Sequence, residues 1–142
     1  MEQSARYKFY ERIEAAPLAA RGFLETVDEH FRQRHDVDVR FSQTSFADMR
    51  LWAVWETSAG KQREQIFATM TWQAKNLAVF ARTKLTPEEL GYLGFEGAAK
   101  PKAEKEPQKS EILLFEEDWR YGAPPFVRAL EAAKVKLMPQ IC

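Results

Sequence analysis

The sequence predicts an α+β fold in which a four-stranded antiparallel meander packs against helices from the N- and C-terminal parts of the chain. Three observations lead to this fold class. Apolar and polar residues alternate between residues 37 and 84 with the period of two that is typical of half-buried strands. Apolar residues recur at helical spacing on both sides of that region. Short polar segments join the alternating stretches, as they do between consecutive antiparallel strands.

The length and the charge of the chain narrow the classes of protein to consider. We expect residues 1–142 to form a single domain, because domains cluster around this size. Hydrophobic residues make up 45% and aromatic residues 13% of the chain, which argues against global disorder. The 21 basic and 21 acidic side chains cancel, so no overall field steers the protein to nucleic acid or to an anionic membrane. Near-zero net charge also removes one protection against self-association.

The cysteine content and the termini point to a cytoplasmic protein. Cys142, the last residue, is the only cysteine, so the chain can form neither an internal disulfide nor a cysteine-based metal cluster. The N-terminal residues lack the apolar core of a signal peptide. Apolar stretches also fall short of the roughly 18 residues that a membrane span needs.

Two helices are expected before the meander. The first covers residues 4–14, with an aromatic face, and ends before Pro17. The second begins at Pro17, because proline suits the first turn of a helix. Its apolar stripe consists of Leu24, Val27 and Phe31.

The meander itself is expected to contain strands near residues 37–42, 46–56, 65–74 and 77–84. A two-residue loop at Lys75-Asn76 would join the last two strands. The cross-strand pairs then place apolar side chains together on one face. These predicted pairs are Ala74 with Leu77, Trp72 with Val79, and Met70 with Ala81.

The part after the meander alternates between structured and flexible segments. Thr86, Pro87 and two glutamates predict the start of a short helix. The segment near 97–109 has no apolar residue larger than alanine, so we expect a flexible loop. A strand at 112–115, an aromatic turn at 119–125 and a last helix that stops at Pro139 complete the prediction.

The sheet face opposite the main apolar face is the first candidate functional site. Aromatic rings interleaved with Arg and Lys are typical of sheets that bind single-stranded nucleic acid. The same pattern is found where helices cover both faces of a sheet and at protein interfaces. We favour a non-enzymatic binding module for a protein partner or for a second copy of the chain, with nucleic-acid association as the alternative. The predicted residues are Arg50, Trp52, Phe67, Thr69, Thr71, Gln73, Phe80, Arg82 and Lys84.

A degenerate restriction-type nuclease is the enzymatic version of that alternative. Such a site needs an Asp near the second strand and an acid-x-Lys pattern on the third, which hold Mg²⁺ and position water. Asp48 matches the first requirement, whereas Gln73 and Lys75 match the second with glutamine in place of the acid. Glu25 or Glu29 could supply a further ligand.

Two weaker candidates complete the set. Trp119 and Tyr121 could line a small groove, or they could close the end of the sheet as an aromatic plug. His30 and His35 match no zinc spacing, and a position near a helix end explains them more simply. We therefore expect no metal and no cofactor, apart from Mg²⁺ in the nuclease alternative.

Overall fold

The structure is a computed structural model that describes residues 2–42, 48–100 and 109–137. It consists of an antiparallel sheet of five strands in the order β1-β2-β3-β4-β5, with helices at both ends of the chain. The α+β fold is thus confirmed, with one strand more than predicted. The elements are α1 (Glu2–Arg12), α2 (Leu18–Arg32), β1 (Val37–Phe41), β2 (Met49–Glu56), β3 (Gln62–Gln73), β4 (Ala78–Thr83), α3 (Pro87–Tyr92), β5 (Ser110–Leu114), α4 (Glu116–Tyr121) and α5 (Ala123–Leu137).

The additional strand is the segment that we expected as a separate strand after the loop. β5 pairs antiparallel with β4, and Leu114 lies opposite Val79. The loop prediction falls partly on residues 101–108, which lie outside the described residues. Within the described part, Ala99 exchanges two backbone hydrogen bonds of 2.9 and 2.8 Å with Glu111. That part of the predicted loop is therefore ordered against the outer edge of β5.

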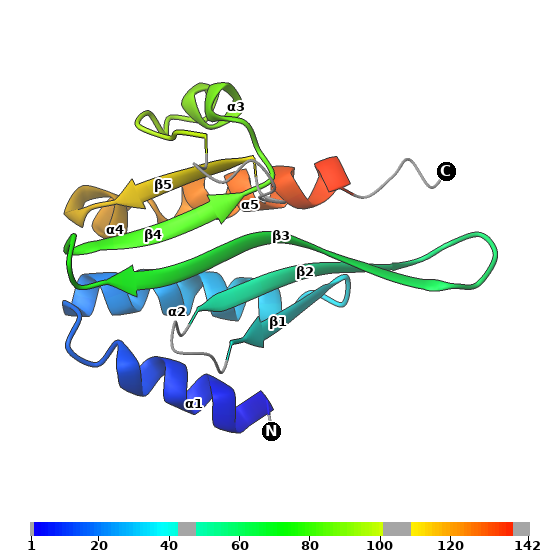
Figure 1. Cartoon of the computed structure of the whole chain (residues 1–142), viewed down its shortest axis with the longest axis horizontal. Helices are drawn as coiled ribbons and strands as arrows, with labels where there is room; N and C mark the ends of the chain where they lie inside the picture. Colours follow the sequence, from blue (N-terminus) through cyan, green and yellow to red (C-terminus); the bar gives the residue numbers. More distant parts are fainter. Residues whose placement is uncertain (1, 43–47, 101–108, 138–142) are drawn as a thin grey trace.

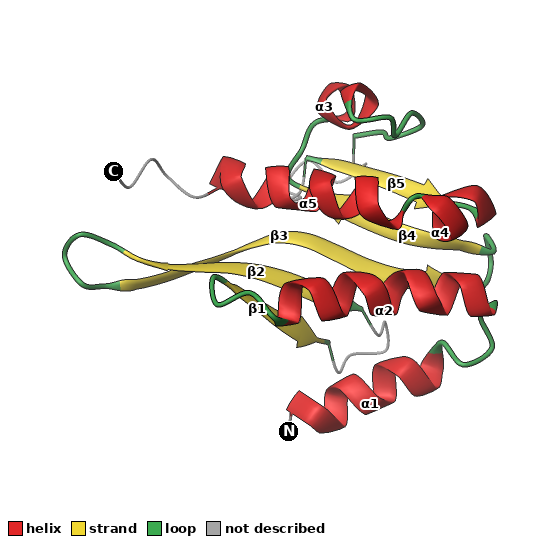
Figure 2. Cartoon of the chain, turned by 180° about the vertical axis from the view of Figure 1, so that it is seen from behind, coloured by secondary structure: helices red, strands yellow, loops and turns green. Residues whose placement is uncertain are grey.

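The helices α2 and α5 lie side by side on one face of the sheet (Figure 2). Their buried aromatic side chains meet there, with the Phe23 and Phe126 rings 5.7 Å apart. Full burial of a large apolar side chain stabilises a fold by roughly 1.5–3 kcal/mol, so this layer provides much of the stability. Its largest fully buried members include Phe23, Leu24, Phe31, Met49, Leu51, Met70, Leu90, Leu114, Phe126 and Leu130.

The hairpin of β3 and β4 has the predicted register but a longer loop. Met70 lies opposite Ala81 and Trp72 opposite Val79, as predicted. The last pair, however, is Gln73 with Ala78, and residues 74–77 form the turn. Leu77 adopts a positive φ of 50° in that turn and is exposed. Because the loop grows by one residue on each side, the register is unchanged.

A β-bulge overturns the predicted position of Phe67. Leu51 pairs with Ala68, whereas Trp52 pairs with Ile66, so Phe67 is left without a partner on β2. The extra residue in a bulge breaks the strict alternation of side chains. Phe67 is consequently 0% exposed and packs against Phe31 of α2, with ring centroids 5.7 Å apart. The alternating pattern had assigned it to the opposite face.

The helical predictions hold at the start of α3 and for the last helix, α5, whereas the predicted aromatic turn before that helix is wrong. Thr86 and Glu89 form a reciprocal capping box, with N···O distances of 3.2 and 2.8 Å. The expected aromatic turn at 119–125 is instead the end of α4, a Gly122 cap and the first turn of α5. The predicted stop at Pro139 lies outside the described residues. Among the helices described, none has the length and apolar character needed to cross a membrane.

Candidate functional site

The second face of the sheet carries no helix within the described chain, so we call it the open face (Figure 1). Three rows of paired residues cross it. Asp38, Trp52 and Ile66 form one row, and Thr71, Phe80 and Leu113 form another. All of these side chains are half-buried. The central row crosses all five strands and consists of Arg40, Arg50, Thr69, Arg82 and Glu111.

Each arginine of the central row has an acidic partner. Arg50 Nε lies 3.2 Å from an Asp48 carboxylate oxygen, and Arg82 Nε lies 3.3 Å from Glu111. Arg40 contacts Asp38 at 2.8 Å and also pairs with a glutamate of β3. The basic character of this face is therefore balanced locally. The pairs are partly exposed, so each is worth about 0–1 kcal/mol and can be exchanged for another partner.

Two of these arginines also lie over aromatic rings. The Arg40 guanidinium carbon is 4.6 Å from the Trp52 ring centroid, and that of Arg82 is 5.1 Å from the Phe80 ring centroid. Such cation–π contacts hold the rings and the cations in a fixed relation. The buried indole Nε1 of Trp52 has no acceptor within the described residues.

A cavity of about 360 Å³ occupies the centre of the open face. Asp48 and Arg50 border it from the β2 side, and Arg82 borders it from β4. Burial raises the pKa of Asp48 above its usual range, although the charge of Arg50 opposes that shift. The cavity wall thus combines an aromatic ring, ionic groups and neutral hydrogen-bonding groups. Its full lining is Asp48, Arg50, Thr69, Met70, Thr71, Gln73, Phe80 and Arg82.

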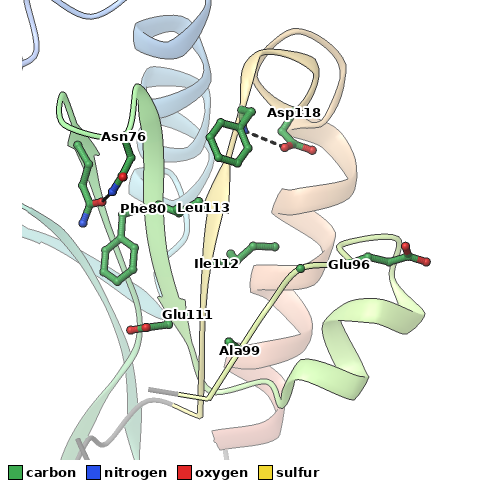
Figure 3. A pocket seen from close by; sticks show the side chains of 11 residues that line it. Asn76, Phe80, Glu96, Ala99, Glu111, Ile112, Leu113 and Asp118 are labelled. Carbon is green, nitrogen blue, oxygen red and sulfur yellow. Dashed lines mark hydrogen bonds between the residues drawn. The ribbon is translucent and has the colours of Figure 1, made fainter. Parts of the chain in front are cut away.

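A second cavity of about 510 Å³ adjoins the first toward the outer edge of β5 (Figure 3). Gln73 and Phe80 line both cavities, so the two share a wall. In Figure 3, Asn76 and Phe80 lie on the inner side of β5, and Glu96 and Ala99 lie on its outer side. The hollow part of the open face therefore extends from β2 to the segment that precedes residue 100.

The structure brings together most of the predicted site, and Lys84 lies one residue beyond the end of β4. Arg50, Trp52, Thr71, Phe80 and Arg82, together with Gln73, reach the open face or its central cavity. Lys84 follows the end of β4, and only 7% of it is exposed. Its backbone N–H donates to the carbonyl of Phe67 at 3.1 Å. The backbone of Lys84 is therefore still bonded to β3 one residue beyond the end of β4.

The three residues of the nuclease pattern are only partly assembled. Asp48 and Gln73 line the central cavity, whereas Lys75 lies in the exposed turn and does not line it. Glu25 and Glu29 are on α2, which covers the other face of the sheet. In residues 2–42, 48–100 and 109–137, no three His, Cys, Asp or Glu side chains gather into a group that could hold a metal ion.

The remaining candidates are explained by other contacts. Trp119 is buried, donates its indole N–H to the Leu114 carbonyl at 2.8 Å, and meets Trp72 edge-on. Tyr121 is 78% exposed, so the two residues do not share a groove and Trp119 acts as the plug. His30 bonds to Glu131 of α5 at 2.9 Å.

Sequence reasoning missed five residues of the open face, which are Asp38, Arg40, Ile66, Glu111 and Leu113. Asp38 and Arg40 alternate with apolar residues in β1, and that pattern could have placed them on this face. Glu111 could not be found in this way, because the sequence did not indicate that β5 joins the sheet beside β4. A comparison with models of protein families, with curated proteins and with solved structures finds no match for this chain.

Proposed function

We propose that this protein is a non-enzymatic binding module whose open face binds a protein partner. The observation that carries the proposal is the cavity of about 360 Å³ at the centre of a sheet face that no described helix covers. Cavities of about 300–1,000 Å³ accommodate compact ligands or anchoring side chains. The lining supplies an aromatic anchor in Phe80 and hydrogen-bonding groups in Thr69, Thr71 and Gln73.

The composition of this face suits a protein partner. Aromatic side chains and arginine are enriched at the centre of protein interfaces and dominate their binding energy. The open face presents Trp52 and Phe80 in contact with Arg40 and Arg82. A partner segment that brings an apolar side chain and a polar backbone could fill the cavity and bond to its threonines.

Balanced charge makes nucleic acid the less favoured partner. Phosphate binding draws its free energy from cations that displace counterions. The arginines of the open face already pair with Asp38, Asp48, Glu64 and Glu111. The rings on which bases would stack lie under arginine side chains of the same face. A nucleic acid would have to displace these contacts before it could use them.

Selection from a displayed peptide library tests the proposal without a known partner. Peptides enriched on the wild-type protein should bind at least about tenfold more weakly to Phe80→Ala, because interface aromatics contribute about 1.4 kcal/mol or more. Tyr121→Ala is the matched control, since Tyr121 is an exposed aromatic residue outside the open face. If the selected peptides bind both variants equally well, the open face is not the binding surface.

Two direct measurements address the nucleic-acid alternative. Fluorescence anisotropy with single-stranded DNA and RNA should show no binding that falls steeply with added salt; such binding, lost in Arg82→Ala, would favour the alternative. Incubation of nucleic acids with Mg²⁺ or Mn²⁺ tests the nuclease version. Cleavage that disappears in Asp48→Ala would contradict a non-enzymatic role.

A further inference from the structure

The hydrogen bonds at both ends of β1 establish which of its residues face β2. The carbonyl of Asp36 accepts from Val54 N–H, and Ser42 N–H donates to the carbonyl of Asp48, each at 2.9 Å. Antiparallel pairs alternate between hydrogen-bonded and non-hydrogen-bonded positions. The even-numbered residues of β1 therefore direct their backbone groups toward β2. Its odd-numbered residues direct theirs toward the outer edge of the sheet.

That outer edge has unused backbone groups. β1 is the first strand in the sheet order, so β2 is its one partner among the strands of the described residues. Val37 N–H has a long contact of 3.5 Å with the Arg34 carbonyl. Within the described residues, the N–H groups of Val39 and Phe41 have no backbone acceptor at this edge. An edge of this kind is a template for pairing with another strand.

The sequence of β1, Val-Asp-Val-Arg-Phe, is complementary to itself in the antiparallel direction. Pairing two copies about Val39 places Asp38 of each copy opposite Arg40 of the other. The odd-numbered residues would form the hydrogen-bonded pairs between the copies, because their N–H and C=O groups point toward the outer edge of the sheet. Asp38 and Arg40 would then occupy non-hydrogen-bonded pairs, where side chains approach most closely. Charges on an edge strand usually oppose pairing, but here they attract.

The helix side of this edge offers room for the partner's apolar side chains. Phe9 of α1 packs against Phe41, with ring centroids 5.1 Å apart, so α1 lies on the same side of the sheet as the core. A cavity of about 220 Å³ lies beside the strand, and its wall combines Val37, Val39 and Phe41 with the ionic side chains of Arg6, Asp28, Arg32 and Asp38. Side chains of the odd-numbered residues of a second β1 would point toward this side. They would therefore lie beside Val37, Val39 and Phe41 of the first copy.

We propose that two copies of this chain associate through their β1 edges to form one continuous antiparallel sheet. The N–H groups of Val39 and Phe41 in each copy donate to the carbonyls of Val39 and Val37 in the other. The ion pair of Asp38 and Arg40, which is 2.8 Å long within one chain, is exchanged for two pairs between chains. A twofold axis perpendicular to the sheet relates the copies, so the two open faces lie on the same side and form one surface.

Charge reversals of single residues test the proposal. Sedimentation equilibrium of the wild-type protein should show a mass that rises from 16.5 kDa toward twice that value as concentration increases from about 1 µM to about 1 mM, the range of small, transient interfaces. Asp38→Arg and Arg40→Asp should each weaken association at least about tenfold, because like charges then face each other. An equimolar mixture of the two variants should form a heterodimer, since both charged cross-strand pairs become attractive again.

Two further variants separate edge pairing from changes in folding. The double variant Asp38→Arg/Arg40→Asp restores opposite charges in every pair and should dimerise like the wild type. Val39→Pro removes an N–H that faces away from β2, so it should abolish the dimer while the far-UV circular dichroism remains that of the wild type. A wild-type protein that stays monomeric would overturn the proposal. It would also be overturned by a dimer that survives Val39→Pro, or by a mixture of the single reversals that does not associate.

Discussion

Replacing Phe67 with alanine should lower the free energy of unfolding by about 3–5 kcal/mol, the usual cost of removing a fully buried phenylalanine. Phe67 is 0% exposed and sits at the β-bulge of β3, where its ring packs edge-on against Phe31. Deletion of the ring removes that contact and leaves a cavity between the sheet and α2. A domain of this size has a total stability of about 5–15 kcal/mol, so the variant should fold with much reduced stability.

Ile66→Ala is the matched control, because it alters the neighbouring residue on the same strand. Ile66 is only half-buried and lies opposite Trp52 on the open face. Its truncation should cost about 1 kcal/mol, the typical effect of a change at a partly exposed position. Urea denaturation followed by tryptophan fluorescence and by far-UV circular dichroism measures both free energies. Equal slopes for the two variants and the wild type would show that the midpoints can be compared.

The opposite order of the two stabilities would contradict the β-bulge. Uninterrupted alternation along β3 would bury Ile66 and expose Phe67, as the sequence pattern predicted. If Ile66→Ala proves more destabilising than Phe67→Ala, the bulge between Leu51 and Trp52 is wrong. The register of the open face on the β2 side would then be wrong as well, and with it the position of Trp52.

Three further predictions concern the helices. Lys134, whose side chain is 6% exposed, bonds to Asp36 and Glu131 at 2.8 Å each, so Lys134→Met should cost about 2–3 kcal/mol in a thermal or urea melt. Burial raises the pKa values of both carboxyls, but the bonds and charge of Lys134 outweigh it and lower them. The stabilisation by these ion pairs is therefore fully present above about pH 4 and is lost as pH falls through the lowered pKa values of the two carboxyls in the folded protein. Urea titrations at several pH values should show that acid reduces the free energy of unfolding less in Lys134→Met than in the wild type. Gly122→Ala should destabilise the protein by about 1–3 kcal/mol, because the new Cβ would lie 2.6 Å from a backbone carbonyl oxygen of α4. Gly91→Ala is the control: a Cβ at Gly91 would meet no atom within 4 Å, so this change should be neutral or stabilising by about 0.5–1 kcal/mol.

The local sequence pattern predicted the structure correctly wherever the environment of a residue depended on residues close to it in the sequence. The capping box at Thr86 needs only a residue three positions away, and it forms as expected. The register of β3 and β4 depends on a short hairpin, so Met70 and Trp72 find the predicted partners even though the loop is longer. Arg50, Phe80 and other members of the predicted patch reach one face for the same reason.

The pattern failed where distant segments decide the outcome. Phe67 turns toward the core because a bulge relative to β2 lets its ring reach α2. The indole of Trp119 finds both Trp72 and the Leu114 carbonyl, contacts that no periodicity reveals.

The amino-acid sequence by itself determined the fold class, the order of most elements and the two faces of the central hairpin. It did so because side-chain periodicity of two or 3.6 is a property of a single segment. Only the tertiary structure decided that β5 joins β4, that no helix of the described residues covers one face of the sheet and that the arginines of this face pair with acids. These features depend on contacts between segments that are distant in the sequence. Packing and charge determine those contacts, and the local sequence pattern does not.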